Sequence, residues 1–193
     1  MAGWLVWPDN QIMKPQLAED DRPPEFLSLE EYLSTVWRPD CEFVDGRSEE
    51  RNGFDFNHSR TVTTLIVTLA DKHEPWRVMA LPSLRMRVAP TRVRVPDLCV
   101  IERESPREQV LTHPPLAVIE VLSEDDRLSL TMEKLADYLR FGVGNIWIVD
   151  PESRIAYRYT SAGLEKVQTG ELAVSGTPIR VVLSEMFAEL DRA

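Results

Sequence analysis

One short apolar segment constrains the fold of this chain more than any other feature. Residues 116–122 read Leu-Ala-Val-Ile-Glu-Val-Leu, a near-continuous apolar run of strand length. A strand without polar alternation is covered on both faces, as in the middle of a sheet that has helices packed on either side. The run therefore predicts an α/β fold in which a central mixed β-sheet is flanked by helices.

The segments around this run supply the expected helices and further strands. A capping box at Ser28 predicts the start of a short helix, and a type I′ turn at Asp45-Gly46 predicts a hairpin over 41–50. Longer helices are predicted over 57–72, 127–141 and 184–190. Strands are predicted over 77–81, 84–88, 98–101, 145–149, 154–159 and 165–168.

Length and composition fit one globular domain with an extension. The chain has 193 residues, of which 43% are hydrophobic and 28% charged, so a sizeable core can form. Residues 1–24 contain four prolines and an acidic cluster, and they are predicted to be an irregular amino-terminal arm; the alternative is a segment that docks on a partner. Residues 25–193 are predicted to form a single α/β domain.

The expected location is the cytoplasm. No apolar run approaches the roughly 18 to 20 residues that span a bilayer, so no membrane segment is expected. The apolar residues 4–7 are followed by Pro8 and preceded by no basic residue, which is untypical of a signal peptide. The two cysteines, Cys41 and Cys99, are too few for a disulfide scaffold and suit reduced thiols.

The net charge excludes a uniformly basic nucleic-acid binder. Lysine and arginine number 22 against 32 acidic residues, which gives a formal net charge of −10. Repulsion would then oppose association with phosphates unless a local basic strip or metal ions offset it. Four arginines at positions 85, 87, 92 and 94 form the only candidate strip in the sequence; the alternative is a solvated hairpin.

Two acidic residues interrupt strands that are otherwise apolar. Glu120 is the only charge in the buried run, where an unpaired carboxylate would cost several kcal/mol, so it requires a cation, a metal ion or a proton. Asp97 precedes the apolar strand 98–101. Two acids on adjacent strands can present oxygen ligands to Mg²⁺. The alternatives are a structural ion pair for Glu120 and a strand or turn cap for Asp97.

Lys134 is a third candidate, on the helix predicted over 127–141. At 100° per residue it falls in a row with Leu130 and Tyr138, beside the core stripe, so its stem can follow the core edge while its ammonium reaches the strand ends. Simple snorkelling is the alternative. Together, the two acids and this lysine suit metal-assisted phosphodiester hydrolysis.

These residues also carry a family resemblance. Pro96-Asp97, Glu120 within 118–123 and the helix lysine Lys134 resemble the PD-(D/E)XK nuclease superfamily. More narrowly, the chain resembles the Uma-two family of restriction-endonuclease-like proteins, over roughly residues 27–160. The resemblance implies a restriction-endonuclease-like fold, a single nuclease-like domain and DNA as the substrate.

The resemblance also implies roles for individual residues. Asp97 and Glu120 would bind Mg²⁺ or Mn²⁺, and Lys134 would assist the attacking water. Glu42 matches an acidic position in the first hairpin, where it would add a ligand or orient a water; the alternative is an exposed strand residue. His58 matches a family histidine at a helix start, where it would touch phosphate or support the site; the alternative is helix capping.

Two departures from the family pattern leave alternative functions open. Leu122 stands at the usual superfamily lysine position, and Leu130 stands where many relatives carry an aspartate four residues before the helix lysine. The first hypothesis is a divalent-metal-dependent endonuclease, a hydrolase that binds DNA weakly and only with metal. The rival is a non-catalytic nuclease-fold module that binds a protein partner, or a metal ion in a degenerate site. Nucleases of this fold often pair to cut two strands, so a homodimer is the default expectation.

A small-molecule hydrolase has little support. The sequence contains no Gly-x-Ser-x-Gly motif, no Cys/His pairing and no phosphate-binding loop.

Overall fold

The structure is a computed structural model that describes residues 26–51, 55–124, 126 and 128–192. The arm predicted over residues 1–24 lies outside this range. Among the described residues, no helix has the length and apolar character needed to cross a bilayer.

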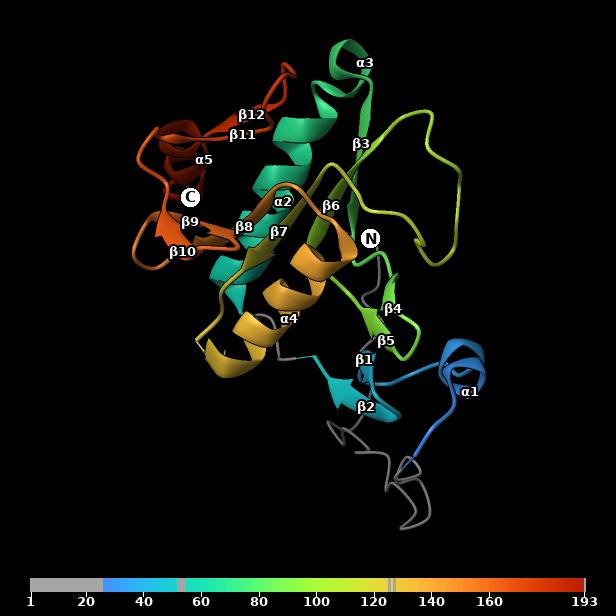
Figure 1. Ribbon diagram of the computed structural model, residues 1–193. Coiled ribbons are helices and arrows are strands. Elements are labelled where there is room, and N and C mark those ends of the chain that lie inside the picture. The colour runs from blue at the N-terminus through green and yellow to red at the C-terminus, as the bar shows by residue number, and fades with distance from the viewer. Residues whose placement is uncertain (1–25, 52–54, 125, 127, 193) are drawn as a thin grey trace, which may run out of the picture.

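A six-stranded mixed sheet forms the centre of the fold (Figure 1). Its order is β10-β9-β8-β7-β6-β3, and β7 and β8 form its parallel pair while the other pairs are antiparallel. The strands are β3 (Val78–Pro82), β6 (Leu98–Glu102), β7 (Ala117–Val121), β8 (Ile146–Asp150), β9 (Ile155–Thr160) and β10 (Gly163–Lys166). The predicted mixed sheet flanked by helices is confirmed.

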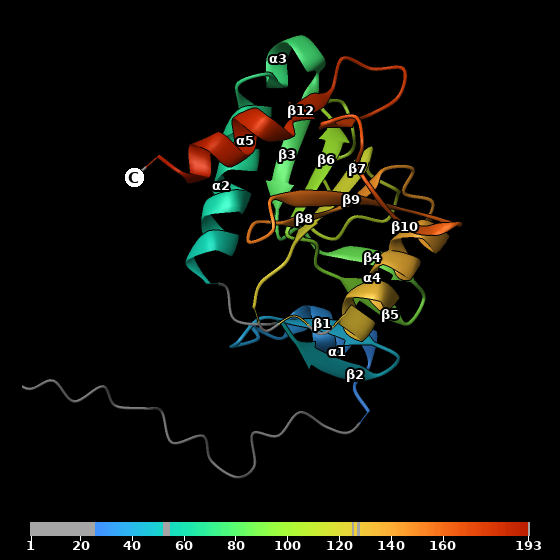
Figure 2. The ribbon, with the colours of Figure 1, turned by 90° about the vertical axis from the view of Figure 1, so that its left-hand side faces the viewer.

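The central strand β7 is buried along its whole length because both of its faces are covered. Ile119 belongs to a core cluster with residues of α2 (Phe56–Ala70) and α5 (Leu183–Leu190). Val118 points the other way, into a cluster with residues of α4 (Leu128–Phe141). The α2–α5 pair and α4 therefore lie on opposite faces of the sheet (Figures 1 and 2).

A second, four-stranded antiparallel sheet adjoins the first (Figure 2). Its order is β2-β1-β5-β4, with β1 (Cys41–Val44), β2 (Arg47–Glu50), β4 (Met86–Ala89) and β5 (Arg92–Arg94). Asp45 and Gly46 have φ values of 48° and 86°, as the predicted type I′ turn requires. After β5 the chain passes through Val95, Pro96 and Asp97 into β6, so one short segment joins the two sheets.

The remaining elements include several that the sequence patterns did not predict. The short helix α1 (Leu29–Ser34) begins at Ser28 with the predicted capping box. The strand predicted over 165–168 lies slightly earlier, as β10. Elements without a prediction are β5, α3 (His73–Trp76), β11 (Glu171–Ala173) and β12 (Arg180–Val182). These are three or four residues long, too short for a clear hydrophobic period.

Candidate active site

All five predicted site residues line one cavity of about 320 Å³. They come from five different parts of the fold: Glu42 from β1, His58 from α2, Asp97 from the turn into β6, Glu120 from β7 and Lys134 from α4. The cavity therefore lies where the two sheets meet α2 and α4.

The strand register places the two acids beside each other. β6 and β7 are antiparallel with Leu98 opposite Ile119, so the preceding Asp97 lies across from Glu120. The Asp97 carboxylate also accepts a hydrogen bond of 2.9 Å from the Val121 backbone N–H. That contact is the strand-capping role considered above, and it fixes the orientation of the carboxylate towards the cavity.

Asp97 is an ionised carboxylate surrounded by donors. Its Oδ1 lies 2.9 Å from Arg51 Nη2, and its Oδ2 lies 3.1 Å from His58 Nε2. Burial alone would raise the pKa of Asp97, but the hydrogen bond from His58 and the charge of Lys134 outweigh it and lower the pKa to about 2.

His58 contacts the candidate ligand and does not cap its helix. The N-cap of α2 is Asp55, whose side chain accepts a 2.7 Å hydrogen bond from the His58 backbone N–H. The capping alternative for His58 is therefore wrong. The cap and the first turn instead direct the buried imidazole towards Asp97.

Glu120 satisfies its buried carboxyl group with a hydroxyl and a cation. Its Oε1 accepts a 2.7 Å hydrogen bond from the Tyr138 hydroxyl, and its Oε2 lies 3.1 Å from Lys134 Nζ. Burial raises the pKa of Glu120 to about 8; Lys134 opposes the shift and the nearby charge of Asp97 adds to it. The carboxyl group therefore releases its proton less readily than an exposed glutamate does.

Lys134 is a fixed cation. Its ammonium lies 2.9 Å from the Val95 carbonyl oxygen, 3.0 Å from Glu42 Oε1 and 3.1 Å from Glu120 Oε2. Burial would lower the pKa of Lys134, but the charges of Glu120 and Glu42 outweigh it and raise the pKa. The ammonium points inward and remains charged, so the snorkelling alternative is wrong.

Glu42 is buried, unlike the exposed strand residue considered as its alternative. Its Oε1 accepts a 2.8 Å hydrogen bond from the Val95 N–H, and its Oε2 lies 2.9 Å from Arg94 Nη1. Burial acts to raise the pKa of Glu42, yet Lys134 and Arg94 lower it below the ordinary value. Glu42 is therefore an ionised acid with donors on both of its oxygens.

The four arginines do not form the expected basic strip, because three of them pair with acidic side chains and only Arg87 is exposed beside the Pro90 carbonyl oxygen. Arg94 is buried between acidic side chains, and Arg92 is ion-paired with Glu133 at 2.8 Å. Arg85 lies 3.3 Å from Asp40. The alternative, a solvated hairpin, is also wrong for Arg94, which is buried and paired with acidic side chains from β1 and α4.

The sequence patterns assigned no role in the site to four residues that contact the candidate residues or their partners. Tyr138 did share the helical row of Lys134, and this spacing of four residues was the available signal. Arg51 and Asp137 carried no signal, and Arg94 was placed in the basic strip, because the contacts Arg51–Asp97 and Arg94–Asp137 each join residues more than 40 positions apart.

The donor chemistry of the cavity fits Mg²⁺ or Mn²⁺. Asp97 and Glu120 present carboxylate oxygens to the same cavity, and Mg²⁺ is usually held by one or two carboxylates, with water and phosphate oxygens completing its shell. Within the described ranges, no group of three or more histidine, cysteine or acidic residues is arranged to hold a metal ion by itself.

Comparisons with known proteins agree with this architecture. The Uma2 family, described as "Putative restriction endonuclease", matches residues 23–188. The fold is similar to the crystal structure of a "putative nuclease belonging to DUF820" from Anabaena variabilis ATCC 29413, with 21% identity and a TM-score of 0.71 over 85% of this chain and 99% of that one. This likeness confirms the predicted restriction-endonuclease-like fold.

A second likeness is weaker. A chain of the cryoEM structure of the DrdV-DNA complex matches with 18% identity and a TM-score of 0.36, over 64% of this chain and 10% of that one. No curated protein matches by sequence. The family match spans most of the chain, including all five predicted site residues, and this chain therefore belongs to the Uma2 family.

Proposed function

We propose that this protein is a divalent-metal-dependent endonuclease that hydrolyses phosphodiester bonds in DNA. The observation that carries the proposal is the meeting of Asp97, Glu120 and Lys134, from three separate elements, in one cavity. Family membership and the nuclease fold of the Anabaena protein support the same reaction class.

Asp97 and Glu120 would hold Mg²⁺ or Mn²⁺. When bound, such an ion polarises a phosphate oxygen and lowers the pKa of a water molecule. Asp97 is already ionised, and its contacts with Arg51 and His58 hold it in place. Glu120 would bind the ion as a carboxylate, and Tyr138 and Lys134 would keep that carboxylate oriented.

Lys134 acts as a cation and not as the general base. Its raised pKa keeps the ammonium protonated, and a protonated amine cannot take a proton from water. Because it is held 3.1 Å from Glu120, its charge lies beside the proposed metal ligand and offsets the negative charge that develops on the phosphate.

A plasmid-nicking assay with Mn²⁺ tests the proposal. Glu120→Gln keeps the shape of the side chain but removes the ionisable ligand, so we expect nicking to fall at least about 100-fold. The matched control is Glu102→Gln, the same change at an exposed position of β6, which should cut at the wild-type rate. Equal nicking by the wild type and Glu120→Gln, with both folded, would exclude this site as the source of hydrolysis.

One observation favours the rival, a nuclease-fold module without catalysis. Both carboxylates already have partners within the protein, Asp97 with Arg51 and His58 and Glu120 with Lys134 and Tyr138. Such a site is satisfied without a metal ion. Metal-independent binding of a protein partner, together with no nicking by the wild type in Mn²⁺, would favour the module.

A further inference from the structure

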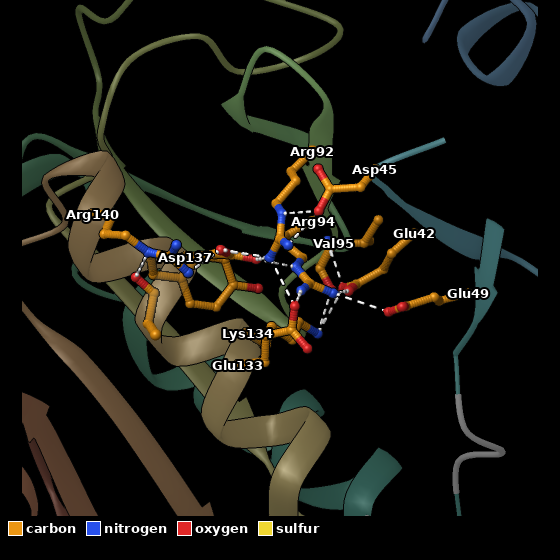
Figure 3. A network of polar contacts seen from close by, with 12 residues as sticks. Glu42, Asp45, Glu49, Arg92, Arg94, Val95, Glu133, Lys134, Asp137 and Arg140 are labelled. Atoms are coloured by element: carbon orange, nitrogen blue, oxygen red, sulfur yellow. Dashed lines mark hydrogen bonds and ion pairs between the residues drawn. The ribbon is translucent and has the colours of Figure 1, made fainter. Parts of the chain in front are cut away.

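Lys134 belongs to a closed ring of buried charges that extends well beyond the cavity (Figure 3). Two of its three acceptors, Glu42 and the Val95 carbonyl oxygen, come from the small-sheet side of the site. Only Glu120 comes from the large sheet. The position of the ammonium therefore depends on how the small sheet is held against α4.

Arg94 makes that connection. Its side chain is 3% exposed, and the guanidinium spans two carboxylates, with Nη1 2.9 Å from Glu42 and Nε 2.7 Å from Asp137. Asp137 lies on α4, three residues after Lys134. The ring thus runs from α4 through Asp137, Arg94 and Glu42 to Lys134, and so returns to the same helix.

The bridge in this ring depends on the shape of the Arg94 guanidinium as well as on its charge. A planar guanidinium can bridge two carboxylates that come from different elements, whereas one ammonium cannot reproduce both contacts. Buried ion pairs are often no more stabilising than apolar side chains of the same volume. Unlike apolar packing, the directional contacts of this ring fix one arrangement of β1, β5 and α4.

We infer that Arg94 and Asp137 are positioning residues, which hold Glu42 so that Glu42 holds Lys134 against Glu120. Glu42 then serves the lysine: its Oε1 accepts from Lys134 and the Val95 N–H, and its Oε2 accepts from Arg94. The effect on turnover rests on the proposed nuclease function, whereas the geometry of Lys134 does not.

The chain offers a direct probe of this geometry because it has only four lysines, at positions 14, 72, 134 and 166. In protein labelled with ¹⁵N-lysine, the buried, hydrogen-bonded ammonium of Lys134 should exchange slowly with water and give a resolved signal. Its disappearance in Lys134→Arg assigns it. The exposed Lys72 and Lys166 exchange too fast to interfere.

Two variants break the ring at different points. Arg94→Lys keeps the charge but loses the bridge, and Glu42→Gln keeps the shape but loses the ionised acceptor. In both, we expect the Lys134 ammonium to exchange at least about tenfold faster. We also expect kcat to fall by about 10- to 100-fold, with KM and Mn²⁺ affinity within about twofold of the wild type, because a small misplacement of a fixed charge affects the transition state most.

The matched control is Arg140→Lys. Arg140 also contacts Asp137, at 2.6 Å, but its side chain is 65% exposed and no contact links it to Glu42. It should leave the Lys134 signal and kcat unchanged. If Arg94→Lys does not fold, Glu42→Gln decides, since Arg94 there retains Asp137 and Glu49.

A folded Glu42→Gln with the wild-type Lys134 signal would overturn the inference, whether or not the protein cuts DNA. If Glu42→Gln alters the Lys134 signal but the wild type does not nick DNA, the proposed function is contradicted while the positioning ring stands.

Discussion

Burial and local charges shift the pKa values of neighbouring carboxyl groups in opposite directions at this site. Asp97 is ionised because donors surround it, whereas burial leaves Glu120 with a raised pKa beside a permanently charged Lys134. The sequence indicated a partner for Glu120, because a lone acid in an apolar strand demands one. It could not indicate which of a cation, a metal ion or a proton would be used.

The same effect of burial predicts that the thiols are unreactive. Burial raises the pKa of both Cys41 and Cys99 to about 12, so at pH 8 only about one molecule in ten thousand carries either thiolate. A disulfide reagent such as DTNB should release no colour from the native protein at pH 8 and two equivalents after guanidinium is added. Rapid stoichiometric reaction of the native protein would contradict this burial.

Local sequence patterns identified some of the site residues. Glu120 was visible as a break in an apolar run, and Lys134 as the charge in a helical row. Glu42 and His58 came from the family resemblance. The pairing of Arg94 with Asp137 could not be foreseen, because the two residues are 43 positions apart and no period in the sequence links a short strand to a distant helix.

Among the elements, those with strong local signals were predicted well. The buried strand β7, the helix α4 and the hairpin of β1 and β2 are where the sequence places them. β5 was missed because it is three residues long and two of these are arginines, which look solvent-exposed in sequence. Their partners on α4 and β1 account for their inward orientation.

The start of α2 gives a prediction at this scale. Asp55 caps the helix through the His58 N–H, and it also accepts a 3.3 Å hydrogen bond from the Glu124 N–H. Asp55→Ala should therefore lower the free energy of unfolding by about 0.5–2 kcal/mol.

Urea titration measures this change. Ser59→Ala, an exposed substitution one turn into the same helix, is the control and should stay within about 0.5 kcal/mol of the wild type. Equal urea midpoints for the wild type and Asp55→Ala would show that the cap does not stabilise α2.

For the whole molecule, the net charge of −10 is distributed in a way that composition could not reveal. Acidic side chains pair with three of the four arginines that the sequence offered as a basic strip, Arg85, Arg92 and Arg94. The cavity itself is lined by six acids and three lysine or arginine side chains: Glu42, Glu49, Glu50, Asp97, Glu120 and Asp126, against Arg51, Arg94 and Lys134. A phosphate can approach such a surface only when a divalent ion offsets the acids, so DNA binding should be weak and metal-dependent.

The homodimer and the single domain over 25–193 stay predictions.

A calorimetric titration with Mn²⁺ tests the central claim most directly, because it measures metal binding by the two acids without requiring turnover. The wild type and the exposed control Glu102→Gln should bind the ion with the same affinity. Asp97→Asn and Glu120→Gln should each weaken binding by at least about tenfold, as expected when one of two carboxylate ligands is lost. Unchanged Mn²⁺ affinity in folded Asp97→Asn and Glu120→Gln would contradict a metal site at these residues.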